Sequence, residues 1–213
     1  MFKAAILLDK ENNWIKNYFP KVLTKRKDIK INLFYHPKKI RKYDIVFLLG
    51  YTKILKDDFL NSNNLVLVVH ESNLPKGKGF APIQWQILEG KNKITFSLIE
   101  AASKFDSGDI IDQEELTFKG SELYDEIRFK QAKITFRLIK RFLKKYPKYD
   151  KTKQTGESSF YRKRNAKDSE LDINLSIKNL FPLLRVVNNE KWPAFFKING
   201  SKYILKIYKK ERQ

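Results

Sequence analysis

The chain has 213 residues, of which 42% are hydrophobic, so it can bury a genuine core in one domain with a small addition. It has no cysteine and only two histidines, which excludes disulfides and cysteine-ligated zinc and leaves too few ligands for a histidine-rich metal cage. We therefore predict no metal site. The formal net charge of +20 raises the question of a nucleic-acid partner, because basic surfaces attract phosphate.

The first half of the chain alternates predicted strands and helices. Apolar residues 4–8 predict a buried strand, apolar residues recur at helical spacing over 14–23, and further strands follow at 29–35 and 43–49. This alternation predicts a mostly parallel, Rossmann-like sheet in an α/β fold. No Gly-x-Gly-x-x-Gly follows the first strand, which argues against a nicotinamide enzyme.

Residues 65–109 combine the residue types and loop positions that catalysis or ligand binding requires. The β-branched run 65–69 predicts a buried strand that ends at His70, and ligands bind at the carboxyl ends of strands in open α/β sheets. A loop with prolines and glycines follows, then a helix at 83–89, a strand at 94–99 and a second polar loop at 104–109. A histidine and one or two carboxylates should therefore meet at neighbouring strand ends.

The second half of the chain predicts one long helix and a small C-terminal region. Apolar residues at helical spacing indicate an amphipathic helix over 121–146, with Ser121 as its cap. A polar linker follows at 148–158, and then a helix at 177–187 and a hairpin of strands 194–198 and 203–208. We expect a catalytic domain at residues 1–150 and a C-terminal α+β region at 151–213 that packs on it.

Two motifs resemble a known family. They read HESNLPKGKGFAP at residues 70–82 and DSGD at residues 106–109, and together they resemble the formyltransferases that use 10-formyltetrahydrofolate. Residues 49–55 resemble the segment that lines the family's folate pocket, and residues 160–200 resemble the C-terminal region of its sugar-modifying and tRNA-modifying members. The resemblance implies a Rossmann-like formyltransferase fold, with 10-formyltetrahydrofolate as the formyl donor.

The resemblance also implies a catalytic set: an asparagine two residues before the histidine, the histidine itself, and the aspartate of the second loop. His70 can accept the amine proton or stabilise an oxyanion, and we expect Asp109 to orient it. Val68 stands at the asparagine position, which removes the amide that holds the formyl oxygen. We expect the amide of Asn73 to replace it, with Ser72 and Gln84 as weaker candidates.

The other expected site residues form three groups. Those implied for cofactor binding are Leu49, Gly50, Tyr51, Ile54, Phe105, Asp106 and Gly108. Those expected to bind the substrate are Ser72, Lys76, Lys78, Gly79 and Trp85. Arg162, Arg164 and Trp192 of the C-terminal region are further candidates for contacts with the acceptor, although surface solvation or core packing explains each of them more simply.

The acceptor is expected to be an amino sugar. Residues 85–90 resemble members that formylate amino sugars, and 213 residues cannot supply the longer N-terminal half and full C-terminal barrel of members that act on initiator tRNA. We expect an N-formyltransferase for a nucleotide-linked amino sugar, such as a 4-amino-4,6-dideoxy sugar for pseudaminic-acid or surface glycan synthesis. The alternatives are formylation of methionyl-tRNA or of a carrier-bound amino acid, and a non-catalytic homologue that kept the folate pocket.

The remaining expectations concern partners and location. The lysines and arginines are scattered along the chain, so a solvated basic surface explains the charge more simply than nucleic-acid binding. The charge also suits a doubly anionic, nucleotide-linked substrate. No apolar run is long enough for a signal peptide or a membrane span, so we expect a soluble, cytoplasmic protein without a membrane partner. A homodimer is compatible with the sequence.

Overall fold

The computed structural model describes residues 1–11, 14–53 and 55–210. Its helices are η1 (Trp14–Tyr18), η2 (Pro37–Lys39), α1 (Asp57–Asn61), α2 (Pro82–Leu88), α3 (Tyr124–Lys145), η3 (Ala166–Ser169) and α4 (Ile177–Val186). Its strands are β1 (Phe2–Leu8), β2 (Ile29–Phe34), β3 (Ile45–Leu49), β4 (Val66–His70), β5 (Lys78–Gly79), β6 (Lys93–Glu100), β7 (Ile110–Thr117), β8 (Phe160–Tyr161), β9 (Ala194–Ile198) and β10 (Ser201–Leu205).

A mixed sheet with the order β2-β1-β3-β4-β6-β7 forms the centre of the fold. The pairs β1 with β2, β1 with β3 and β3 with β4 are parallel, whereas β6 runs antiparallel to both β4 and β7. The fold is therefore α/β with a mostly parallel sheet, which confirms the predicted class. Two small two-stranded sheets pair β9 with β10 and β5 with β8.

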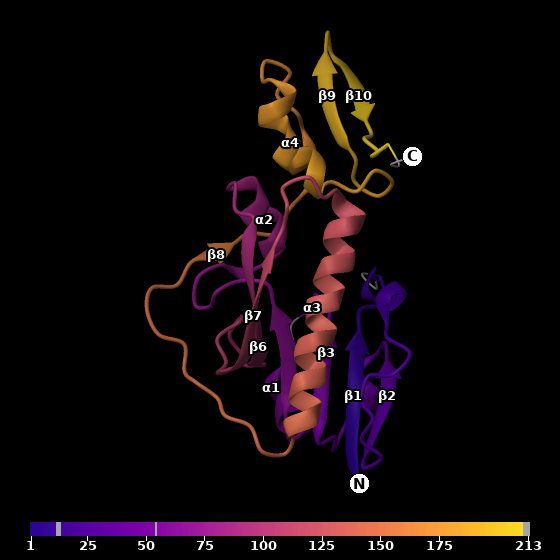
Figure 1. Cartoon of the computed structure of the whole chain (residues 1–213), viewed down its shortest axis with the longest axis vertical. Helices are drawn as coiled ribbons and strands as arrows, with labels where there is room; N and C mark the ends of the chain where they lie inside the picture. Colours follow the sequence, from indigo (N-terminus) through magenta and orange to yellow (C-terminus); the bar gives the residue numbers. More distant parts are fainter. Residues whose placement is uncertain (12–13, 54, 211–213) are drawn as a thin grey trace.

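Alternation along the strands divides the core between the two faces of the sheet. On one face, residues such as Phe47 and Leu67 pack with Leu138 of α3, which runs along the sheet in Figure 1. On the other face, Val46 and Val66 pack with residues of α1. The two faces of β4 therefore look toward different helices, a property that decides how the site is divided.

Several elements differ from the sequence prediction: β10 covers Ser201–Leu205 instead of 203–208, and α1, β5 and β8 were not expected. The helix expected over 14–23 is a short 3-10 helix, η1, because Pro20 has no backbone N–H and disfavours helical geometry in the residue before it. The edge strand β7 was not expected, since its residues are mostly polar. Helix α3 begins at Tyr124 and not at Ser121, because the carboxylate of Glu126 accepts a hydrogen bond from the backbone N–H of Leu123 at 2.8 Å.

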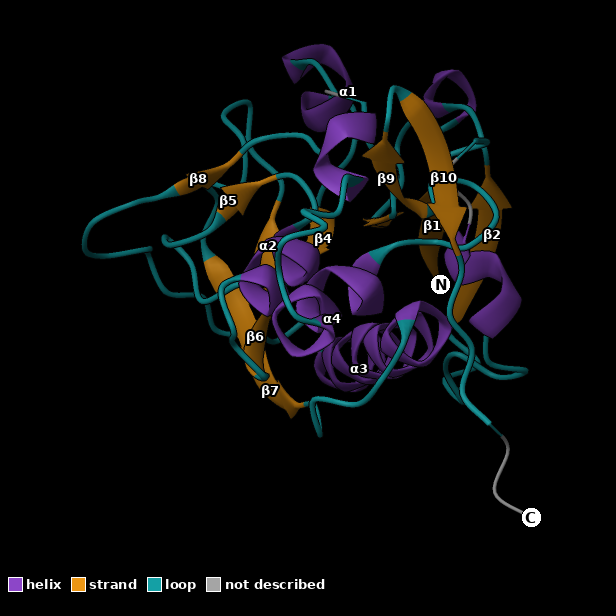
Figure 2. Ribbon diagram, turned by 90° about the horizontal axis from the view of Figure 1, so that it is seen from above, coloured by secondary structure: helices purple, strands orange, loops and turns teal. Residues whose placement is uncertain are grey.

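The C-terminal region gathers at one end of the sheet. After α3 a long segment without regular structure returns along the outside of the molecule to β8, and α4 and the β9–β10 hairpin follow (Figures 1 and 2). This end has its own apolar cluster, which includes Leu180 and Ala194. Arg185 of α4 joins it to the rest by donating hydrogen bonds to the Glu122 carbonyl oxygen at 3.1 Å and to the Asn92 side chain at 3.0 Å.

Across the described residues, the structure contains no helix with the length and apolarity that crossing a bilayer requires.

Candidate active site

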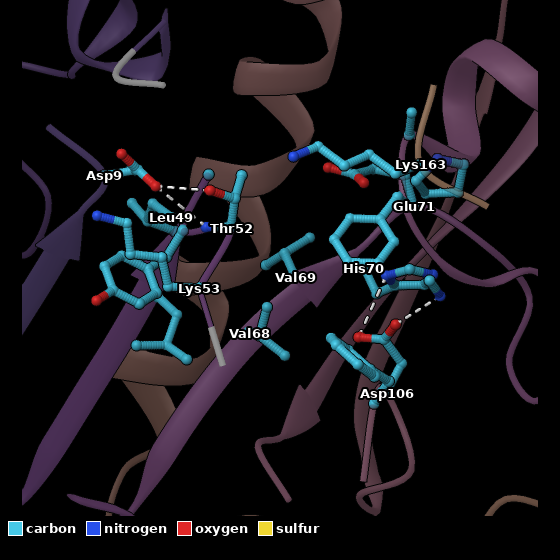
Figure 3. Close-up of a pocket in the computed structure, with 18 of the residues that line it drawn as sticks. Asp9, Leu49, Thr52, Lys53, Val68, Val69, His70, Glu71, Asp106 and Lys163 are labelled. Atoms are coloured by element: carbon cyan, nitrogen blue, oxygen red, sulfur yellow. Dashed lines mark hydrogen bonds and ion pairs between the residues drawn. The ribbon is translucent and has the colours of Figure 1, made fainter. Parts of the chain in front are cut away.

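The carboxyl ends of β1, β3 and β4 open into one cavity of about 730 Å³ (Figure 3). Asp9 follows β1, Gly50 follows β3, His70 ends β4, and Asp106 comes from the loop between β6 and β7. The cavity therefore lies at the edge of the sheet where the sequence placed the site. It is a crevice of the kind that parallel strand ends create.

His70 is held from both sides of its ring, and only 5% of it is exposed. Its Nε2 lies 2.7 Å from the carbonyl oxygen of Gly77, which can only accept, so Nε2 carries a hydrogen and donates. Its Nδ1 lies 3.5 Å from Oδ1 of Asp106. The ring is thus fixed with Nδ1 as its proton-accepting position and with a carboxylate beside that position.

Asp106, and not Asp109, is the carboxylate that accompanies His70. The backbone N–H of Gly79 donates to Oδ2 of Asp106 at 2.8 Å, which leaves Oδ1 toward the imidazole. Asp109 does not line the cavity, and its Oδ2 lies 3.5 Å from Nζ of Lys151. The expectation that Asp109 orients His70 is therefore wrong: the two aspartates are three residues apart in a turning loop, and only the first faces the strand end.

The loop that carries Asp106 is fixed by close contacts that only certain residues allow. Gly79 has φ +95°, and a Cβ there would lie 2.4 Å from the carbonyl oxygen of Tyr161. At Gly108 a Cβ would lie 1.9 Å from the carbonyl oxygen of Glu100. Gln154, from the segment after α3, donates to the carbonyl oxygens of Asp106 and Gly108, both at 2.8 Å. Gly79 and Gly108 therefore contribute to the site by allowing close approaches of the backbone that a side chain would prevent.

The structure does not place Asn73 where it could replace the missing amide. Asn73 is exposed, lies outside the cavity, and accepts a hydrogen bond from Gln113 at 3.4 Å. Val68 does line the cavity. It shares a face of β4 with His70, because the two positions are two residues apart in a strand. Position 68, where an asparagine was expected, is thus part of the cavity wall. Asn73, which was expected to replace that asparagine, is not.

The other residues expected to bind the substrate surround the cavity rather than line it, apart from Gly79. Ser72 is buried behind the strand end, and the described residues offer its Oγ no hydrogen-bond partner. Lys76 lies in the loop after β4, Lys78 begins β5, and neither side chain lines the cavity. Trp85 stacks on Tyr161 and donates through Nε1 to the carbonyl oxygen of Arg162 at 2.9 Å. Trp85 therefore supports the β8 segment.

On one side of β4 the cavity is apolar. Its walls on this side, which we call the α1-side compartment, are Leu48, Tyr51, Leu55, Leu60, Val68 and Ala101. Of the residues expected to bind the cofactor, Leu49, Gly50, Tyr51, Phe105 and Asp106 line the cavity. Gly108 does not, and Ile54 lies outside the described residues. A slot with apolar walls at a strand end is suited to a flat, mostly apolar ring system.

On the other side of β4 the cavity is polar. This α3-side compartment includes Trp14, Glu71, Gln84, Arg128, Gln131 and Thr135. Oε1 of Glu71 accepts a hydrogen bond from Nε2 of Gln131 at 2.5 Å, and Oε1 of Gln131 accepts one from Nη1 of Arg128 at 2.7 Å. The guanidinium of Arg128 also lies over the ring of Trp14, 4.5 Å from its centroid. The polar side chains are therefore organised by one another.

Residues of the C-terminal region close this compartment and add positive charge. Lys163, Arg164, Lys191 and Trp192 line the cavity. Arg164 donates through Nη2 to the carbonyl oxygen of Asp168 at 2.8 Å, while its Nη1 is buried and finds no partner among the described residues. Burial lowers the pKa of Arg164, and the pull of Asp168 opposes this. An anion in the cavity would satisfy the unpaired N–H groups. Of the three predicted acceptor contacts, Arg164 and Trp192 reach the cavity, and Arg162 does not.

Sequence reasoning missed the residues of α3 and Glu71 in the α3-side compartment. Arg128, Gln131 and Thr135 lie at positions i, i+3 and i+7 of α3, on the face that also carries the apolar core residues. Polar side chains that interrupt an apolar stripe at this spacing are a signal that the sequence does contain. Glu71 had a plainer signal, since it follows His70 directly.

Comparison with known proteins agrees with this geometry. A family model described as formyl transferase matches residues 13–141. The chain belongs to the formyl transferase family. This family uses 10-formyltetrahydrofolate as its formyl donor, and the match confirms the family implied by the two motifs.

Three similar proteins illustrate the range of this family. The bifunctional polymyxin resistance protein ArnA of Wigglesworthia glossinidia brevipalpis is 30% identical over 207 residues, which cover 89% of this chain and 31% of that protein. A methionyl-tRNA formyltransferase structure from Clostridium thermocellum has a TM-score of 0.82 at 19% identity, covering 99% of this chain and 94% of the other. A 4-N formyltransferase structure from Francisella tularensis has a TM-score of 0.75 at 17% identity, covering 99% of each chain.

These similarities establish the family and the fold of the chain, but not its acceptor. The two solved structures share the fold, at identities under 20%. The chain spans about a third to a half of the length of the curated relatives that it matches. Family and fold are therefore established, and the acceptor has to be argued from the cavity itself.

Proposed function

We propose that this member of the formyl transferase family transfers the formyl group of 10-formyltetrahydrofolate to the amine of a nucleotide-linked amino sugar. The observation that carries the proposal is the His70–Asp106 pair, with Nδ1 and Oδ1 3.5 Å apart, between an apolar and a charged compartment of one cavity. Two substrates of different chemistry can reach such a pair from opposite sides of β4. Formyl transfer requires the donor and the acceptor to bind beside the same catalytic groups.

The α1-side compartment fits the formyl donor. Leu48, Tyr51, Leu55 and Ala101 provide apolar walls for the pterin ring, and the chain turns at Gly50 with φ +61° so that its backbone can approach the ring edge. Phe105 flanks the opening on the side of Asp106. The bound donor supplies an activated one-carbon group at the strand end.

His70 moves the proton that formyl transfer has to relocate. Its Nε2–H is committed to Gly77, so Nδ1 takes a proton from the attacking nitrogen and returns one to the departing donor nitrogen. Asp106 stabilises the imidazolium in between, because its Oδ1 faces Nδ1 and its other oxygen is held by Gly79. These roles of His70 and Asp106 are part of the proposal.

The charges of the cavity support a nucleotide-linked acceptor. Lys163, Arg164 and Lys191 line the side away from the apolar slot, and the described residues give neither lysine an ion-pair partner. The diphosphate of a nucleotide would satisfy the buried Nη1 of Arg164. The similar 4-N formyltransferase from Francisella tularensis supports transfer of the formyl group to a nitrogen. The acceptor that we propose is an amino sugar, such as a 4-amino-4,6-dideoxy sugar for glycan synthesis.

The proposal gives the two segments of the chain different roles. We assign donor binding and proton transfer to a catalytic domain at residues 1–150, and contacts with the acceptor to residues 151–213. Lys163, Arg164, Lys191 and Trp192, which line the acceptor side of the cavity, all belong to the second segment.

Methionyl-tRNA is the second candidate acceptor. The net charge of +20 and the similarity to the methionyl-tRNA formyltransferase of Clostridium thermocellum favour it. The proposal is tested by incubating the protein with 10-formyltetrahydrofolate and either a panel of nucleotide-linked amino sugars or methionyl-tRNA. Mass spectrometry should detect a formylated sugar. Formylation of methionyl-tRNA alone would replace the first acceptor with the second.

A further inference from the structure

Glu71 occupies a place in the cavity that none of the roles above uses. It follows His70 at the end of β4, and successive residues of a strand point to opposite faces. Leu67 and Val69 pack on the face of α3, whereas Val66 packs on the face of α1, so Glu71 belongs to the α3 side and His70 to the α1 side. The two neighbouring side chains thus reach the same strand end from the two compartments.

Its contacts hold the carboxyl group of Glu71 in place and leave one of its oxygens available to a ligand. Gln131 donates to Oε1 at 2.5 Å, and Gln86 donates to the backbone carbonyl oxygen of Glu71 at 2.7 Å. No other side chain among the described residues donates a hydrogen bond to Oε2. Arg128 is engaged with Gln131 and, in the amide orientation that satisfies both groups, with the oxygen of Gln84 at 3.0 Å. One carboxyl oxygen is therefore left for a ligand in the α3-side compartment.

The electrostatic surroundings of Glu71 suit a proton acceptor. Burial raises the pKa of its carboxyl group, and this effect outweighs the opposing influence of His70, the Gln131 hydrogen bond and Arg128. The charged groups that face it are His70 on its own strand, Arg128 on α3, and Lys163 across the cavity, whose side chain extends beside that of Glu71 in Figure 3. A carboxylate with a raised pKa takes a proton from an ammonium group more readily than an exposed one does.

We propose that Glu71 binds the ammonium group of the acceptor in the α3-side compartment and takes from it the proton whose loss makes the nitrogen nucleophilic. The proposal rests on the proposed formyl transfer. The ammonium group begins with three hydrogens on nitrogen and the formamide product keeps one. One proton goes to Glu71 and then to solvent, and one passes through His70 to the donor nitrogen, as the new carbon–nitrogen bond forms and the carbon–nitrogen bond of the donor breaks.

The test compares Glu71→Gln with the wild type. Glutamine keeps the size of the side chain and an oxygen for Gln131, but it cannot take a proton. We expect kcat/KM for the amino sugar to fall about 100-fold or more. The decline of kcat/KM toward acidic pH should also become less steep, because Glu71 no longer contributes to it while His70 still does. A Glu71→Asp variant should recover part of the rate. Glu115→Gln, the same change in an exposed ion pair with Lys93, is the matched control and should retain wild-type kinetics.

Two further readouts separate this role from a structural one. The rise in melting temperature caused by tetrahydrofolate should be equal in the wild type and Glu71→Gln, since the donor compartment is intact. Calorimetric titration of the amino sugar, without donor, should give a larger Kd for the variant. If Glu71→Gln keeps the rate and pH profile of an active wild type, Glu71 has no such role and formyl transfer still stands. A wild type that formylates no amine overturns both proposals.

Discussion

The buried carboxylate of Glu122 joins the C-terminal region to the rest of the molecule, and its removal is the sharpest stability test. Only 3% of Glu122 is exposed. Its two oxygens accept hydrogen bonds from the backbone N–H groups of Lys119 at 2.8 Å and Gly120 at 3.1 Å, and its Oε1 also pairs with Lys130. Arg185 of α4 lies 3.6 Å from Oε2. Glu122→Gln removes the charge on which these contacts converge.

The magnitude follows from the pKa of Glu122. Burial alone would raise the pKa, but the hydrogen bonds from Lys119 and Lys130 outweigh it and lower the value from 4.5 to about 2. That difference corresponds to about 3 kcal/mol of stabilisation of the folded state by the ionised form. Because the folded-state pKa is depressed, this stabilisation is complete above about pH 5 and is lost as the pH falls toward 2. We expect Glu122→Gln to lower Tm by about 6 to 12 °C at pH 7.

Differential scanning calorimetry at several pH values measures this effect. The gap in Tm between the wild type and Glu122→Gln should be large at neutral pH and should narrow steadily as the solution is acidified. Glu115→Gln serves as the control, since its exposed ion pair with Lys93 is worth less than about 1 kcal/mol. Equal Tm values of Glu122→Gln and the wild type at pH 7, or a difference in Tm that does not depend on pH, would show that the charge of Glu122 does not stabilise the fold.

Three further predictions concern the cavity. Asp106→Asn should reduce turnover about 100-fold or more, whereas Asp109→Asn should leave it within a few-fold, so equal losses in steady-state kinetics would count against the His70–Asp106 pairing. Asn73→Ala should be silent, because Asn73 is exposed outside the cavity, and Val68→Asn should raise turnover by restoring an amide donor; a large loss in Asn73→Ala would reverse that assignment. Arg164→Met should raise KM for the nucleotide-linked sugar at least ten-fold with little change in kcat, and an unchanged KM would remove Arg164 from the acceptor site.

The parts of the fold that depend on apolar periodicity could be predicted from the sequence. The buried strands β1, β3 and β4 and the long helix α3 each have a continuous or helical apolar pattern that leaves one interpretation. The edge strand β7 could not be predicted in this way, because its exposed face and its ion pairs with α3 make it polar. The antiparallel pairing of β6 with β4 depends on the path of the chain through the HESNLPKGKGFAP loop, which no local pattern specifies.

The position of the site in the fold could be predicted from the sequence, but not all of the side chains that form it. His70 and the second loop were expected at the strand ends, because motif and strand pattern agree there. The choice between Asp106 and Asp109 could not be made from spacing, since it depends on which carboxylate the N–H of Gly79 holds in a turning loop. Gln154 was out of reach for a similar reason, because it contacts the Asp106 carbonyl oxygen from 48 residues away in the sequence.

We propose above all that His70 and Asp106 catalyse transfer of a formyl group from 10-formyltetrahydrofolate to an amine in this cavity. The most direct measurement supplies donor with an isotopically labelled formyl carbon, together with nucleotide-linked amino sugars, to the wild type and to His70→Ala. The label in the amine product is followed by mass spectrometry. We expect a labelled formamide with the wild type and at least 100-fold less with His70→Ala, while both proteins still show the tetrahydrofolate-induced rise in Tm. A wild type that binds tetrahydrofolate yet transfers no label to the amino sugars or to methionyl-tRNA would contradict it.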